Sequence, residues 1–266
     1  MQPGKAAILA WEQRWSRPVA LATFASILLI VAAIAVATQG VGGGGGESEL
    51  LRNVDAHRGA QLLSSILQAI GVGLLAVPLY YLFRAAKARS ERMRAQFVGI
   101  VVAAPLFLAV AAIFTLIVTL HAADEFVSNH VPTLLEKGVG LSSDRADEVA
   151  TNVVTDAPLR SIVGVLGLVG ALSFVFAMIY TSLHAMRSGL LTRFWGALGI
   201  ALGAISFLPF PPFYLFWFLY FGLLLAGRVP GGKPPAWQSG EAEPWLSPGQ
   251  KTAAELEQPS DDETPR

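Results

Sequence analysis

Phe97–Leu120 reads FVGIVVAAPLFLAVAAIFTLIVTL and contains no Asp, Glu, Lys or Arg. A bilayer core is about 30 Å thick, so a helix of roughly 20 apolar residues crosses it. Three further runs have the same character: Val19–Thr38, Leu62–Phe83 and Ser161–Leu183. These uncharged runs predict an all-α fold, a polytopic membrane helix bundle.

Another apolar region, Phe194–Ala226, is interrupted by Pro209, Pro211 and Pro212. As one helix it would be about 50 Å long, much longer than the bilayer core. Proline removes a hydrogen bond from a helix interior, so we expect a hairpin of two short spans. The prediction is therefore six transmembrane helices within residues 19–227. A re-entrant pair in place of the last two spans is the alternative.

Basic residues gather in every second connection between these runs. The densest group lies within Arg84–Arg94. Because cytoplasmic loops retain Lys and Arg during insertion, we expect both termini to be cytoplasmic in a bacterial-type plasma membrane. The outer connections are then residues 39–60 and 121–160. They hold five of the 19 Lys and Arg residues, namely Arg52, Arg58, Lys137, Arg145 and Arg160.

The two ends of the chain are expected to lie outside the bundle. Residues 1–18 are predicted to form a cytoplasmic leader with an interfacial helix, because Ile8, Trp11 and Trp15 share one helical face. An unstructured leader is the alternative. Ala35-Val36-Ala37 resembles a signal-peptide cleavage site, but the apolar run before it is long, so a retained anchor is expected.

Residues 228–266 are polar and proline-rich, and they are predicted to form a disordered cytoplasmic tail. Trp237 and Trp245 are its exceptions. They are expected either to return to the membrane interface or to bind a protein partner.

One helix is predicted outside the membrane, in the second outer connection. Ser143 is placed to cap it. Apolar residues then repeat at helical spacing at Ala146, Val149, Ala150, Val153 and Val154.

Composition excludes several classes of site. The chain is 14% charged, against about 25% for a typical soluble domain, and its formal net charge is zero, so no nucleic-acid partner is expected. It has no cysteine, which excludes disulfides and thiolate metal centres. It also lacks a Gly-x-Ser-x-Gly elbow and an HExxH helix. We therefore predict no catalytic residues and no cofactor.

A metal site is one hypothesis for the outer end of the third span. His121 and Glu125 are one helical turn apart there, with Asp124 and His130 close by. Imidazole and carboxylate groups bind divalent metals, and His57 is a further candidate ligand. The alternative is that these polar residues mark a helix leaving the bilayer.

Two further sites are hypotheses on polar side chains. The basic cluster is a candidate site for anionic lipid headgroups, with a role in topology alone as the alternative. Its members are Arg84, Lys87, Arg89, Arg92 and Arg94. Gln61, Ser65 and Gln68 lie in a polar stripe on the second span and are candidates for lining a solute path. Hydrogen bonding between helices is the alternative for this stripe.

Two stretches carry a family resemblance. Arg187–Gly199, RSGLLTRFWGALG, resembles the loop-into-helix segment of uncharacterised six-span bacterial membrane families of unknown function. The GGKPPAW tail, Gly231–Trp237, and the Ala- and Gly-rich style are similar to actinobacterial membrane proteins. The resemblance implies six spans, no known activity and no catalytic residues.

Three functions fit the sequence. The first is a non-enzymatic membrane or scaffold protein, in contact with lipid and with a second copy or a protein partner through helix faces or the tail. The second is a transporter or channel for a neutral or lipid-like solute. The third is a membrane enzyme with a metal site at the outer end of helix three.

Overall fold

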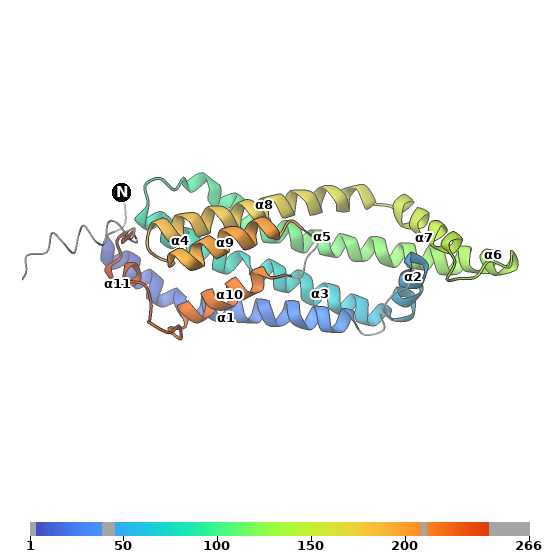
Figure 1. Ribbon diagram of the computed structural model, residues 1–266, viewed down its shortest axis with the longest axis horizontal. Helices are drawn as coiled ribbons and strands as arrows, with labels where there is room; N and C mark the ends of the chain where they lie inside the picture. The colour runs from blue at the N-terminus through green and yellow to red at the C-terminus, as the bar shows by residue number, and fades with distance from the viewer. Residues whose placement is uncertain (1–3, 39–45, 209–211, 245–266) are drawn as a thin grey trace, which may run out of the picture.

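The computed structural model describes residues 4–38, 46–208 and 212–244, and these fold as an elongated all-α bundle (Figure 1). Four helical spans are long and apolar enough to cross a membrane. The chain is thus a polytopic membrane protein in contact with lipid. The four spans are α1 (Lys5–Ala37), α3 (Arg58–Leu74) continued by α4 (Ala76–Arg89), α5 (Val98–Glu125), and α8 (Arg160–Arg187).

Small residues and short hydrogen bonds hold neighbouring spans together. Gly71 of α3 lies against α1, where an added Cβ would stand 2.8 Å from Ile30 Cγ1. The hydroxyl of Ser26 donates to the Gly71 carbonyl at 2.6 Å. The hydroxyl of Ser64 donates to the Ala33 carbonyl at 2.9 Å. In lipid, such close approach and polar contacts replace the hydrophobic effect between helices.

The proline-broken region forms two short helices, α9 (Arg193–Ile205) and α10 (Tyr214–Leu225). They have 13 and 12 residues, or about 20 and 18 Å at 1.5 Å per residue. Each is shorter than the bilayer core. The two short helices predicted from the prolines are therefore confirmed. Four spans are long and apolar enough to cross a membrane, and six spans are not shown.

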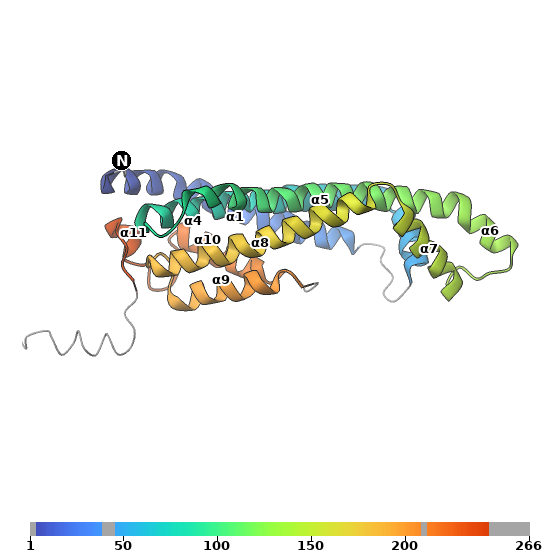
Figure 2. The ribbon, with the colours of Figure 1, turned by 90° about the horizontal axis from the view of Figure 1, so that it is seen from above.

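Glycines allow α9 to pack closely against α8, which runs beside it in Figure 2. A Cβ added at Gly196, Gly199 or Gly203 would stand 2.3–2.7 Å from a side-chain atom of α8. The hydroxyl of Thr192 caps the helix by accepting from the Trp195 N–H.

We use "distal end" for the end of the bundle formed by α2 (Glu47–Ala56), α6 (Val131–Glu136) and α7 (Asp144–Asp156) (Figure 1). A π-helical turn, η2 (Phe126–His130), links α5 to α6. The prediction of α7 is confirmed, because the Ser143 hydroxyl accepts from the Ala146 N–H and the apolar face is buried. The core of the distal end includes Leu51, Phe126, Ala146, Ala150 and Val153.

We use "basic end" for the opposite end, where α1 begins and α4 and α8 end. The leader is not a separate element there, because residues 5–17 continue directly into the first span as one helix. The tail also differs from the disordered segment expected. Residues 228–244 fold back onto the bundle, and α11 (Ala236–Ser239) buries Trp237 to 8% exposure. Residues 245–266, including Trp245, lie outside the described residues.

A 3-10 turn, η1 (Ala95–Phe97), leads from the basic end into α5.

Candidate functional site

A buried ion pair ties three segments together at the basic end. Glu12 of α1 and Arg89 of α4 have side chains 4% and 0% exposed. The guanidinium donates to both carboxylate oxygens, with Nη2 2.9 Å from Oε2. It also donates to the Ala236 carbonyl from Nε at 3.1 Å and Nη2 at 2.8 Å. Arg89 thus holds the tail and the leader against α4.

An aromatic stack lies beside this ion pair. The rings of Trp11 and Tyr81 are 5.0 Å apart, and those of Tyr81 and Trp237 are 6.0 Å apart. Polar atoms on these rings also have partners: the Tyr81 hydroxyl donates to the Glu12 carbonyl at 3.0 Å, and Trp237 Nε1 donates to the Leu190 carbonyl at 2.9 Å. Trp237 is therefore part of the basic end's core.

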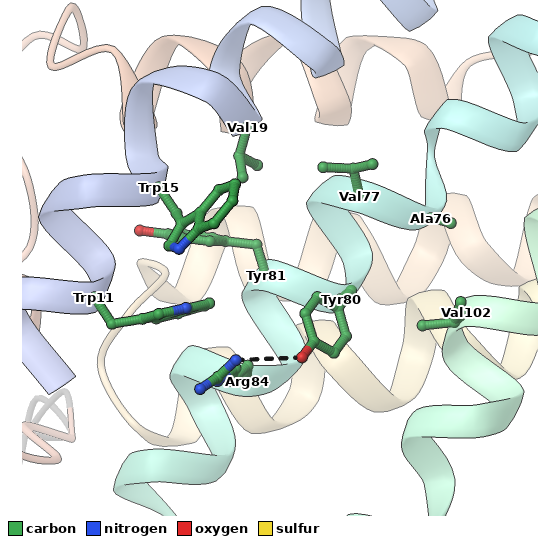
Figure 3. A pocket seen from close by; sticks show the side chains of 9 residues that line it. All are labelled: Trp11, Trp15, Val19, Ala76, Val77, Tyr80, Tyr81, Arg84 and Val102. Atoms are coloured by element: carbon green, nitrogen blue, oxygen red, sulfur yellow. Dashed lines mark hydrogen bonds between the residues drawn. The ribbon is translucent and has the colours of Figure 1, made fainter. Parts of the chain in front are cut away.

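An apolar groove of about 520 Å³ opens beside the stack, between α1, α4 and α5 (Figure 3). Its volume lies in the usual range of ligand pockets, about 300–1,000 Å³. The walls are aromatic and aliphatic, and one lining residue is charged. The lining residues are Trp11, Trp15, Val19, Ala76, Val77, Tyr80, Tyr81, Arg84 and Val102.

Arg84 is the charged residue of the groove. Its guanidinium carbon lies 4.4 Å from the centre of the Trp11 ring, and Nη1 donates to the Tyr80 hydroxyl at 3.3 Å (Figure 3). Both contacts are with neutral groups, and Arg84 has no ion pair among the residues that the structure describes. The groove therefore joins apolar walls to a cation whose charge no described carboxylate offsets.

The structure divides the predicted headgroup cluster. Arg84 lies at the groove, and Arg92 and Arg94 are exposed on the connection after α4. Lys87 is half-buried and interacts electrostatically with His184. Arg89 is buried in its ion pair and is not available to lipid.

The four predicted metal ligands are not brought together. His121 Nε2 and Glu125 Oε2 are 3.9 Å apart on an exposed face. Asp124 accepts instead from Arg58 at 2.6 Å, and the His130 ring stacks on Phe126. Across residues 4–38, 46–208 and 212–244, no group of three His, Cys, Asp or Glu side chains is placed to hold a metal ion.

The three predicted solute-path residues do not share a buried face. Gln61 and Ser65 are half-buried on α3, and Gln68 is exposed. The neighbouring Ser64 is the buried one, and its hydroxyl binds the α1 backbone. Helix-to-helix hydrogen bonding, the alternative for this stripe, thus holds for Ser64.

The residue pairs that build the basic end were not predicted from the sequence. Glu12 was one polar residue in a leader, and Arg89 was one of five basic residues in a cluster. The two lie 77 positions apart, so no local pattern links them. The one available signal was a carboxylate on the same helical turn as Trp11 and Trp15.

Comparison with known proteins adds no assignment, since no protein-family model, no curated protein and no solved structure matches this chain.

Proposed function

We propose that this chain is a non-enzymatic plasma-membrane protein that binds an anionic phospholipid of the cytoplasmic leaflet in the groove between α1, α4 and α5. The observation that carries the proposal is Arg84, a cation without a described carboxylate partner at an open apolar groove between α1, α4 and α5.

Charge distribution supports a cytoplasmic basic end. Arg14, Arg17, Arg84 and Lys87 all lie near this end, and positive charge is retained on the cytoplasmic side of membranes. Trp11 and Trp15 lie on the same stretch of α1, as expected for aromatic residues at the headgroup level. The distal end then faces outward.

Headgroup charge is what makes the groove selective. A lipid tail gains little by moving from the bilayer into the groove, because both surroundings are equally apolar. A guanidinium beside a phosphate forms charge-assisted, often bidentate hydrogen bonds. A basic residue near the membrane surface attracts anionic lipid by about 1 kcal/mol, which is an enrichment of about fivefold.

The short hairpin fits a re-entrant pair better than two full spans. The ring of Tyr214, at the start of α10, is 5.2 Å from that of Phe174, midway along α8. Gly203, near the end of α9, packs on Met178 of α8. These contacts place the described ends of α9 and α10 beside the middle of α8, which supports the re-entrant pair. Both alternatives left open by the sequence, six spans or four spans with a re-entrant pair, return the tail to the cytoplasmic side.

Retained lipid tests the proposal. The full chain is reconstituted in an equimolar mixture of phosphatidylglycerol and phosphatidylcholine, extracted, and analysed by native mass spectrometry. We expect phosphatidylglycerol to be enriched about fivefold in the bound fraction. Arg84→Gln is expected to bring the ratio close to one, because the cation is lost.

The matched control is Arg94→Gln, which removes an exposed arginine from the same basic connection without touching the groove. It is expected to keep the enrichment. Equal enrichment in the Arg84→Gln variant and the unmodified protein would contradict the proposal.

A further inference from the structure

A second cavity, of about 920 Å³, lies at the basic end. Four segments meet around it: the connection after α4, the end of α8, the beginning of α9 and the folded tail. The lining residues are Arg89, Ser90, Glu91, Arg92, His184, Met186, Arg187, Ser188, Arg193, Ala197, Ala242 and Pro244. Unlike at the Arg84 groove, most of the residues that line this cavity are polar or charged.

The lining of this cavity is rich in arginine. Its cations outnumber its one acid, Glu91. The charge of Arg89 is already balanced by Glu12. Arg92 and Arg187 are exposed, and neither forms an ion pair within the part of the chain that the structure describes. Guanidinium groups gathered around a concave site attract an anion.

His184 is a buried polar residue on the wall of this cavity. It is 6% exposed, its ring packs on Tyr180 at 4.5 Å, and its Nδ1 has no hydrogen-bond partner among the described residues. Leaving a buried polar group unpaired costs about 1–3 kcal/mol, so native proteins rarely do so outside functional sites. His184 is therefore a buried imidazole with an unpaired nitrogen among the residues that line the cavity, and this observation is independent of the arginines.

The start of α9 adds a third favourable feature. This helix of 13 residues begins at Arg193, on the cavity wall. The amino terminus of a helix carries partial positive charge and favours anions.

We propose that this cavity is a binding site for a phosphate group presented from the cytoplasm. Arg92 and Arg187 supply planar guanidinium groups that match phosphate oxygens, and His184 supplies an imidazole on the inner wall. The phosphate is carried either by a soluble molecule or by a lipid headgroup. The site is separate from the Arg84 groove, and the proposal shares with the proposed function only the orientation of the bundle.

Binding to lipid-embedded protein tests this proposal. The full chain is placed in nanodiscs of phosphatidylcholine alone and titrated with inorganic pyrophosphate by calorimetry. We expect saturable binding at one site per chain. Arg187→Gln is expected to raise the Kd about tenfold or more, because a charge-assisted hydrogen bond is lost. Arg187→Lys is expected to weaken binding less, since it keeps the charge but not the bidentate geometry.

Arg145→Gln, in α7 at the distal end, is the matched control and is expected to bind pyrophosphate as the unmodified protein does. Arg84→Gln is a second control, which separates this site from the lipid groove. If pyrophosphate does not bind, but phosphatidic acid added to the nanodiscs is retained in an Arg187-dependent way, the phosphate comes from lipid. Absence of both, or equal binding by Arg187→Gln and the unmodified protein, overturns the proposal.

Discussion

The two ends of the bundle are both covered by short elements, yet they are held in different ways. The distal end has an apolar core beneath α7, which has a side-chain cap, and α2, which has acidic residues in its first turn. The ion pairs of this end are exposed. The basic end has a buried ion pair and an aromatic stack that join the leader, α4 and the tail. An apolar core and exposed polar contacts thus hold the distal end, whereas a buried ion pair and stacked rings hold the basic end.

Breaking the buried ion pair is the strongest way to test this contrast. Glu12→Gln is expected to lower the free energy of unfolding by about 3–5 kcal/mol, because Arg89 is left as an uncompensated buried charge. Denaturant unfolding in micelles measures the loss. A Glu12→Leu, Arg89→Met double variant is expected to recover most of it, since well-packed apolar pairs often replace buried ion pairs at little cost.

The matched change at the distal end is Asp124→Asn, which removes the exposed partner of Arg58. Exposed pairs contribute little, so no measurable loss is expected. A loss as large as that of Glu12→Gln would remove the difference between the two ends.

Truncating the distal core is expected to have the next largest effect. Leu51 is fully buried there, and Leu51→Ala is expected to cost about 2–5 kcal/mol through lost burial and the cavity left behind. Hydrogen exchange should rise in α2 and α7 and stay unchanged in α11. Simultaneous loss of protection in α11 would show that the two ends do not fold separately.

Removing a helix cap is expected to cost less, and similarly at each end. Ser143→Ala leaves the Ala146 N–H of α7 without its side-chain acceptor, and Thr192→Ala does the same to the Trp195 N–H of α9. Each is expected to lower stability by about 1 kcal/mol. Denaturant unfolding measures both, and a cost above that of Leu51→Ala would contradict the packing account.

The smallest effect is a pH dependence confined to the distal end. Hydrogen bonds from the side chain and the backbone N–H of Ser48 lower the pKa of the Asp147 carboxyl. Because the folded pKa lies below the unfolded one, this contact stabilises the fold above the ordinary carboxyl pKa and is lost as pH falls through the lowered value.

Hydrogen exchange of α2 should therefore increase below the ordinary carboxyl range. Asp147→Asn should remove this pH dependence, and Asp144→Asn, a neighbouring acid on the same helix, should retain it. An unchanged pH response in Asp147→Asn would refute the assignment.

The sequence predicts the features that depend on local pattern, and it does not predict the contacts between distant residues. Uncharged runs such as Phe97–Leu120 and the Ser143-capped helix were predicted, because helical period and length are local properties. The hairpin was predicted from its prolines, but the level at which it turns depends on how α9 and α10 pack on α8 and α1. The burial of Glu12 and Trp237 was not predicted, because their partners are distant in sequence. The groove at Arg84 forms only where α1, α4 and α5 pack together. The sequence does not indicate which residue of the basic cluster lines such a groove.

Photo-crosslinking with a phosphatidylglycerol that carries a diazirine on its acyl chain tests the central claim most directly. We expect the crosslinked peptides to come from the groove walls around Val77 and Val102, to be fewer with the matching phosphatidylcholine probe, and to be lost in Arg84→Gln but not in Arg94→Gln. Crosslinks spread evenly over the lipid-facing surfaces of α3, α5 and α8, or kept at the groove in Arg84→Gln, would contradict the claim.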